Sequence, residues 1–217
     1  MLEHIPHWLG AMLTNVRAGH AKLVIVQDGI VTNGKRLDLS SPAFPDGGRL
    51  PERFTADGSG VSPPVVWGDV PMGTSSIALI VEDPDAPTPN PLVHAVVWNI
   101  PPEERRLGEG MIAKDGDGGA DGRDVGKNSY LSEGWLPPDP PTGHGNHDYV
   151  FQLFALSQTP DLDPNPGRSS VIEALRGNVL SAGLLVGTYS RGEDAGVGSD
   201  SVVEPSLGNR DLGTSLA

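Results

Sequence analysis

The stretch SIALIVEDPDAPTPNPLVHAVVWNI, residues 76–100, decides the fold class of this chain. Its two ends, residues 76–81 and 93–100, are short and almost continuously apolar, which is typical of central strands that are covered on both faces. The prolines between them fix the backbone and interrupt any helix, so the chain has to turn between the two runs. We therefore predict two buried strands joined by a rigid bend.

The bend carries the polar side chains of greatest interest. Asp83 and Asp85 follow the first apolar run, and His94 opens the second. If the two strands are neighbours, Asp83 and His94 meet at the same end of the sheet. Because a proline-fixed bend holds its side chains at little further cost in entropy, this arrangement predicts a small preorganised polar pocket. A proline-rich surface loop with solvated acids is the alternative interpretation.

A third strong strand is expected over residues 148–156. Period-two alternation places His147, Tyr149, Phe151 and Leu153 on one face of it. Further elements are expected as strands at 65–67 and 182–189 and as a helix from Ser169 or Ser170 to about Gly177.

These strands would bring two carboxylates, two histidines and a phenol to one end of the sheet. Such groups, with backbone N–H donors, can bind phosphate or another oxyanion. Taken alone, His147 suits a strand-end histidine that binds a loop carbonyl, and Tyr149 suits the core. His144 and His147 could also bind a metal, but no third ligand lies near them in sequence, so we expect none.

Composition limits the class of protein. A chain of 217 residues suits one domain, and its 29 glycines, 21 prolines and 5% aromatic residues favour many short strands and long loops over a helical bundle. The absence of cysteine excludes disulfides and cysteine-ligated zinc. A net charge of -13 disfavours nucleic acid and anionic membrane surfaces as partners.

The sequence also bears on location and catalysis. It contains neither an apolar stretch long enough to span a bilayer nor the pattern of a secretory signal, so we expect a cytoplasmic protein without membrane insertion. A nucleophile elbow, a phosphate-binding glycine loop and a dinucleotide fingerprint are absent, so we predict a binding protein with no cofactor rather than an enzyme. The alternative is a small hydrolase or lyase that uses Asp83 and His94 as base and orienter.

We predict three regions along the chain. Residues 1–36 form an N-terminal extension, with an amphipathic helix over 6–18 and a first strand near 22–26, where Asp28 and Gly29 could equally turn a hairpin. Residues 37–191 form the main domain. Residues 192–217 form an acidic, Gly/Ser-rich tail that we expect to be poorly ordered, because it has little apolar area to bury.

Three motifs carry a family resemblance: DPDAP at 83–87, HAVVWNIP at 94–101 and PPTGHGNHDY at 140–149. With the motifs SPPVVW at 62–67 and GKNSY at 126–130, the chain resembles the phosphatidylethanolamine-binding protein family from residue 37 to 189, and within it the bacterial Raf kinase inhibitor-like branch. The resemblance implies a mostly β, sandwich-like fold with a large central antiparallel sheet, a smaller second sheet and a few peripheral helices.

The resemblance also implies a small pocket for phosphate, carboxylate or phospholipid head groups. Carried over by position, its residues are Asp83, Asp85, His94, Pro140, His147 and Tyr149. The implied function is ligand binding, with inhibition or regulation of a kinase or protease as a further expectation. A third interpretation is a structural or oligomeric protein with a vestigial pocket, and the N-terminal helix could support a homodimer.

The chain departs from the family pattern near the expected pocket. Leu92 and Val93 precede His94 where the family usually has an aromatic residue or histidine, and Asp148 replaces a common basic residue. By alternation, Asp148 should point to the opposite face of the sheet from the pocket. We therefore expect a functioning pocket with altered selectivity at its rim.

Overall fold

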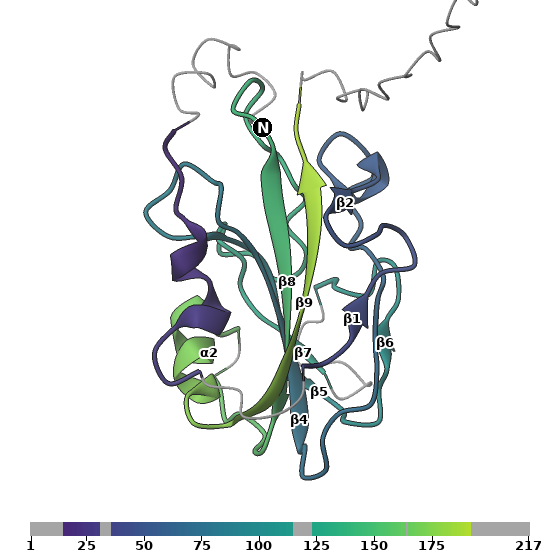
Figure 1. The fold of residues 1–217 in the computed structure, drawn as a ribbon, viewed down its shortest axis with the longest axis vertical. Helices are drawn as coiled ribbons and strands as arrows, with labels where there is room; N and C mark the ends of the chain where they lie inside the picture. The colour runs from purple at the N-terminus through teal and green to yellow at the C-terminus, as the bar shows by residue number, and fades with distance from the viewer. Residues whose placement is uncertain (1–14, 31–35, 115–122, 164, 192–217) are drawn as a thin grey trace, which may run out of the picture.

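The chain forms two β-sheets in the computed structural model, which describes residues 15–30, 36–114, 123–163 and 165–191 (Figure 1). The larger sheet has six strands in the order β2-β9-β8-β4-β5-β7, and the smaller sheet has three in the order β1-β3-β6. The small-sheet strands are β1 (Leu39–Ser40), β3 (Val65–Trp67) and β6 (Arg106–Leu107). The large-sheet strands are β2 (Gly48–Arg49), β4 (Ser76–Asp83), β5 (Leu92–Ile100), β7 (Asp124–Val125), β8 (His147–Leu156) and β9 (Val179–Tyr189).

The centre of the large sheet consists of the three strands that the sequence predicted most clearly. All eight residues of β4 are buried, and β4 pairs antiparallel with both β5 and β8. The β8 and β9 strands are also antiparallel, and only the short β2 runs parallel to its neighbour β9 within the described sheets. The predicted sandwich with a large, mainly antiparallel sheet is therefore confirmed.

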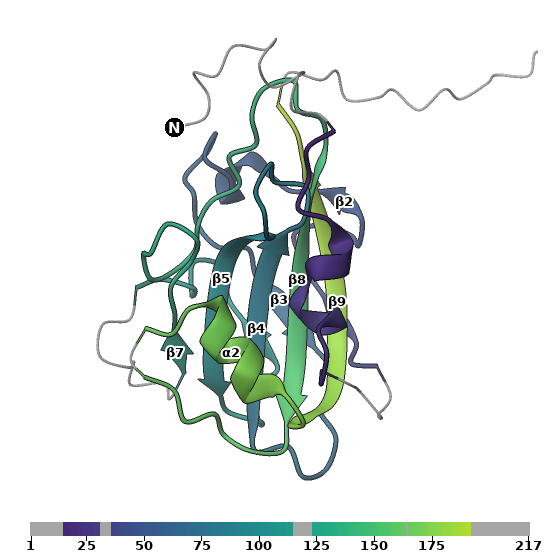
Figure 2. The ribbon, with the colours of Figure 1, turned by 90° about the vertical axis from the view of Figure 1, so that its left-hand side faces the viewer.

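Each face of the large sheet has its own apolar core. Leu79, Val97 and Phe151 face the small sheet and pack with Trp67 and other small-sheet residues. On the opposite face, a second apolar cluster includes residues of the helix α2 (Arg168–Leu175) and of one of the short 3-10 helices. Figure 2 shows α2 lying across this face of the sheet. The 3-10 helices are η2 (His20–Lys22), η3 (Val24–Val26) and η4 (Glu52–Phe54), of which η2 and η3 lie on this face. Covering on both sides explains why the central strands are continuously apolar.

A β-bulge changes which way His94 points. The β4–β5 register pairs Val81 with Ala95 but Glu82 with Val93, so His94 is the extra residue. Regular alternation along β5 would place His94 on the same face as Val96 and Trp98, but the structure places it on the other face. Val96 and Trp98 lie in the α2-side core, whereas the His94 ring contacts Tyr149 from the other face.

The strand expected near residues 22–26 is wrong, because this segment forms η2 and η3 instead. Its apolar run does pack on the sheet, but two of its backbone N–H groups bind side chains of the sheet, and others bind carbonyls within the segment, rather than a neighbouring strand. Val24 N–H donates to Glu82 at 2.9 Å, and Ile25 N–H donates to Gln152 at 2.9 Å.

The remaining predictions for the ends of the chain fall mostly outside the described residues. This holds for residues 6–14 of the expected helix over 6–18 and for the whole tail at 192–217, while residues 15–18 are not helical. The predicted helix and last strand near the C-terminus are confirmed as α2 and β9.

Candidate functional site

A cavity of about 480 Å³ lies where β4 ends and β5 and β8 begin, at the upper end of the sheet in Figure 1. Four of the six predicted site residues line it, namely Asp83, His94, Pro140 and His147. Most of the remaining wall is apolar and rich in proline, with Pro87, Leu136, Pro137 and Pro141 among its members. Proline-rich walls are stiff, so the cavity is preformed.

Asp83 shapes the bend and orients a histidine at the same time. One carboxylate oxygen accepts the N–H groups of Asp85 at 2.8 Å and Ala86 at 3.0 Å, which closes the turn after β4. The other oxygen lies 2.7 Å from Nδ1 of His147. Since a carboxylate only accepts, His147 Nδ1 carries the proton and the ring orientation is fixed.

His147 uses its second nitrogen as well. Its Nε2 lies 2.6 Å from Nδ1 of His144, which is fully buried. The two rings and Asp83 therefore form one buried chain of hydrogen bonds. The sequence singled out His144 only as a candidate metal ligand, and its observed contact is with His147.

His94 differs from His147 because one of its nitrogens has no partner. Nδ1 donates to the carbonyl of Leu136 at 2.6 Å, whereas buried Nε2 has no hydrogen-bond partner among the described residues. Burial lowers the pKa of His94, and the nearby Asp83 carboxylate only partly opposes this shift. The neutral ring therefore presents an unsatisfied nitrogen beside the cavity that His94 lines.

Tyr149 supports His94 but does not itself line the cavity. The two rings meet edge to face, with centroids 5.0 Å apart. The Tyr149 hydroxyl is buried without a hydrogen-bond partner in the described part of the chain, and burial raises the pKa of this phenol well above its usual value. The hydroxyl thus keeps its proton and is available as a donor.

Asp85 does not line the cavity and holds the N-terminal segment instead. Its carboxylate lies 2.5 Å from the Arg17 guanidinium and accepts the N–H of Asp148 at 2.8 Å. Asp148 points to the opposite face of the sheet, as predicted, where it contacts His20 at 3.2 Å. Asp85, Asp148 and His20 bring potential metal-ligand atoms within 4.8 Å of one another, but Arg17 already places a cation there.

The sequence missed an ion-pair cluster beside the cavity. Arg191 follows β9 and binds two carboxylates, those of Asp57 and Asp139, and Asp139 lines the cavity. Asp139 stands within the proline block at 137–141, which was the only local signal that it lies near the site. Its partner Arg191 lies 52 residues away, a separation that no sequence motif bridges.

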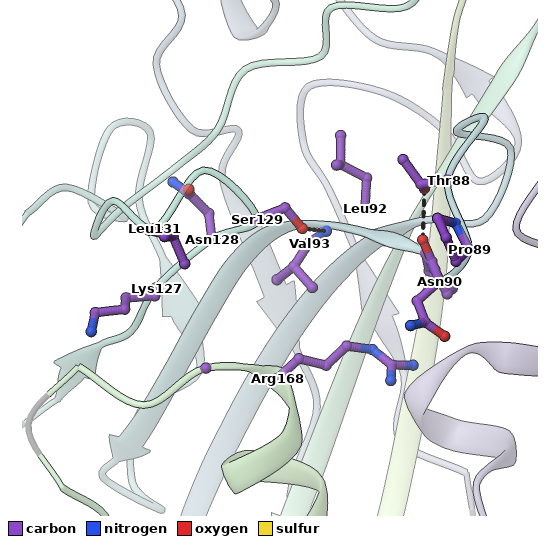
Figure 3. A pocket seen from close by; sticks show the side chains of 12 residues that line it. Thr88, Pro89, Asn90, Leu92, Val93, Lys127, Asn128, Ser129, Leu131 and Arg168 are labelled. Carbon is purple, nitrogen blue, oxygen red and sulfur yellow. Dashed lines mark hydrogen bonds between the residues drawn. The ribbon is translucent and has the colours of Figure 1, made fainter.

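A second hollow of about 430 Å³ lies across Leu92 from the first, and Thr88 and Leu92 line both. Figure 3 shows that Lys127 and Arg168 extend along it in opposite directions. The Arg168 charge is balanced by buried Glu82 at 2.5 Å, so Lys127 is left as the main charge of this hollow. The first cavity is the stronger candidate because it contains the buried unsatisfied nitrogen of His94.

Comparison with known proteins supports a single family. The sequence model described as "Phosphatidylethanolamine-binding protein" matches residues 40–190. A UPF0098 protein of Methanothermobacter thermautotrophicus is 41% identical over 156 residues, which are 72% of this chain and 100% of the relative. LppC of Mycobacterium tuberculosis, whose name points to a lipoprotein, is 36% identical over 70% of this chain and 72% of its own length.

Solved structures agree with these sequence matches. YbcL of E. coli, described as a member of the mammalian PEBP family, superposes with a TM-score of 0.67 at 28% identity, covering 72% of this chain and 99% of YbcL. The PEBP homolog CT736 of Chlamydia trachomatis gives a TM-score of 0.64 at 30% identity, covering 73% and 99%. With the sandwich fold and the extent of the sequence match, the chain belongs to the phosphatidylethanolamine-binding protein family.

Proposed function

We propose that the chain is a binding protein whose cavity holds a small oxyanion, of the phosphate or carboxylate type, on His94. The observation that carries this proposal is the buried Nε2 of His94, which lies beside the cavity without a partner. Leu136 holds the other nitrogen, so the ring cannot rotate to satisfy Nε2 within the protein. Binding of an oxyanion there places a proton on Nε2, taken from an acid group of the ligand or from solvent, and Nε2 then donates to the anion oxygen.

The apolar walls add to the ligand description. Proline and leucine side chains surround the polar end of the cavity, and about 480 Å³ exceeds the space that a bare phosphate needs. The proposed ligand therefore has a compact acidic group with a less polar portion attached, as in a phospholipid head group or an organic acid.

The geometry does not favour the hydrolase or lyase alternative. That mechanism required Asp83 and His94 to act as a pair, but Asp83 binds His147 while His94 donates to the Leu136 carbonyl. The two groups on which general-base catalysis would depend are therefore not hydrogen-bonded to one another.

The proposal has further parts: a non-enzymatic role, regulation of a kinase or protease, a homodimer and a cytoplasmic location. No helix in the described part of the chain has the length and apolar character needed to cross a membrane.

Calorimetric unfolding in inorganic phosphate tests the proposal. A ligand at 100 times its Kd stabilises the folded state by about 2.7 kcal/mol, which raises the Tm of a domain of this size by several degrees. We expect this rise in Tm, called the phosphate increment below, in the wild type, and we expect its loss in His94→Ala. Sodium chloride at equal ionic strength controls for general screening of the acidic protein.

His20→Ala is the matched histidine control, because His20 is exposed and lies outside the cavity. It should keep the full phosphate increment. The increment, not the absolute Tm, is compared, since removing a buried ring destabilises the fold by itself. A wild type that responds to phosphate no more than to chloride would contradict the proposal.

A further inference from the structure

Two carboxylates compete for one guanidinium at the wall of the cavity. Arg191 donates through Nε and Nη2 to Asp57, at 2.6–2.9 Å, and through Nη1 to Asp139 and to the Pro140 carbonyl. The Arg191 side chain is only 8% exposed, and that of Asp139 is 14% exposed. Charges held this far from water are poorly screened. Arg191 and its two carboxylates carry one more negative than positive charge, and Arg49, which lies over the Tyr189 ring, adds a positive charge on the Asp57 side of the cluster.

Only one of the two carboxylates faces the cavity. Asp139 lines it, whereas Asp57 does not and also accepts the Tyr189 hydroxyl at 2.7 Å. Asp83 is the second carboxylate in the cavity wall, and none of the described lining residues is an arginine or lysine. The proposed anion cavity is thus bordered by negative charge, and the Arg191 guanidinium beside it is already paired.

The charges of Asp139 and Arg191 also act on Tyr149, the buried side chain beside His94. Burial is the main reason that the pKa of Tyr149 is raised, but Asp139 adds to the rise and Arg191 opposes it. Tyr149 packs against His94, so a ligand on His94 lies in the same field.

We propose that Asp139 sets the charge selectivity of the cavity, so that it accepts singly charged oxyanions and disfavours doubly charged ones. Asp139 forms an ion pair with Arg191 in the place that a ligand anion would otherwise take. Its carboxylate also repels an anionic ligand, and this repulsion grows in proportion to the charge of the ligand. The inference rests on the proposed function, since it assumes that an anion binds on His94.

The test measures binding of acetate, a monoanion, and sulfate, a dianion, by calorimetric titration at constant ionic strength. Asp139→Asn keeps the side-chain size and an oxygen for Arg191 but removes the charge. We expect acetate affinity to rise by about tenfold, the order of one charge–charge contact in a partly solvated site, and sulfate affinity to rise by clearly more. The ratio of the sulfate and acetate affinities therefore increases.

Asp57→Asn is the matched control, because Asp57 binds the same guanidinium outside the cavity. It should leave the sulfate-to-acetate ratio within about twofold of the wild type, since its charge is farther from the ligand. An equal change of the ratio in both variants would overturn the inference, as would a fall in anion affinity that parallels a fall in Tm in Asp139→Asn.

The wild type provides an independent check if Asp139→Asn does not fold. It should bind acetate more tightly than sulfate, and the reverse preference overturns the inference without any variant. The two proposals fail differently: if neither anion binds to any variant, the proposed function itself fails. If both bind through His94 but the ratio is unchanged in Asp139→Asn, only the role of Asp139 is refuted.

Discussion

His94 shows what a single residue contributes to this site. Its position after the proline bend was predictable, and so was its proximity to Asp83, because the two strands are adjacent. Its orientation was not predictable, since the bulge that turns it depends on a register with β4 that no local pattern encodes. His147 and Tyr149 lie on the predicted face because the pairing of β8 with β9 is regular at that point.

The low pKa of His94 leads to a prediction for acid stability. Burial lowers this pKa below its ordinary value of 6.5, so the unfolded chain binds the proton more readily than the folded one. The free energy of unfolding that depends on neutral His94 is fully present above the ordinary pKa, which applies to the unfolded chain. It is lost as the pH falls below that pKa and through the lower pKa of the folded state. Urea unfolding between pH 7.5 and about 5 should show this decline.

His94→Gln, which does not titrate at this position, isolates the contribution of the one ring. The variant should lose less stability than the wild type over the same pH interval, whatever its stability at neutral pH. Parallel curves for the two proteins would show that other groups cause the acid sensitivity. Saturating phosphate should also reduce the decline in the wild type, because the ligand favours the protonated ring.

At the scale of elements, buried Glu82 connects the large sheet to the segments that cover it. Its side chain is inaccessible to solvent and binds Arg168 at the start of α2, Val24 N–H in η3, and Gln152 on β8. The strands β4 and β5 were placed correctly because each is a bounded, almost continuously apolar run. Within the segment at 22–26, the apolar run covers only residues 23–26, and such a short run is ambiguous between strand and helix until its tertiary hydrogen bonds are known.

Glu82→Ala should therefore destabilise the protein by about 3–5 kcal/mol, the usual cost of breaking a buried ion pair. The amide of Val24 should also exchange with solvent faster, since Glu82 is its acceptor. Chemical denaturation and hydrogen exchange measure the two effects.

Glu173→Ala is the control on α2. Glu173 pairs with Arg176 at 3.2 Å, and its side chain is 75% exposed, so its removal should change stability by about 0.5 kcal/mol or less. Equal losses in the two variants would contradict the structural role of Glu82.

At the scale of the whole molecule, a few sequence motifs predicted the fold and the family. They did not predict the charge balance of the site. A net charge of -13 describes long-range behaviour, but the cavity depends on how Asp83, Asp139 and Arg191 are arranged over a few ångströms. That arrangement joins segments from three parts of the chain, which explains why sequence spacing could not reveal it. The division at residues 36 and 191 and the roles of the two ends stay predictions.

The most direct measurement of the central claim is nitrogen NMR of the imidazole rings during titration with inorganic phosphate. We predict that Nε2 of His94 moves from the unprotonated to the protonated range with saturable 1:1 binding, while Nδ1, already bonded to the Leu136 carbonyl, changes little. Exposed His20 should not follow the same curve. Binding without any change at His94, or no saturable change in any ring, would contradict an anion site built on His94.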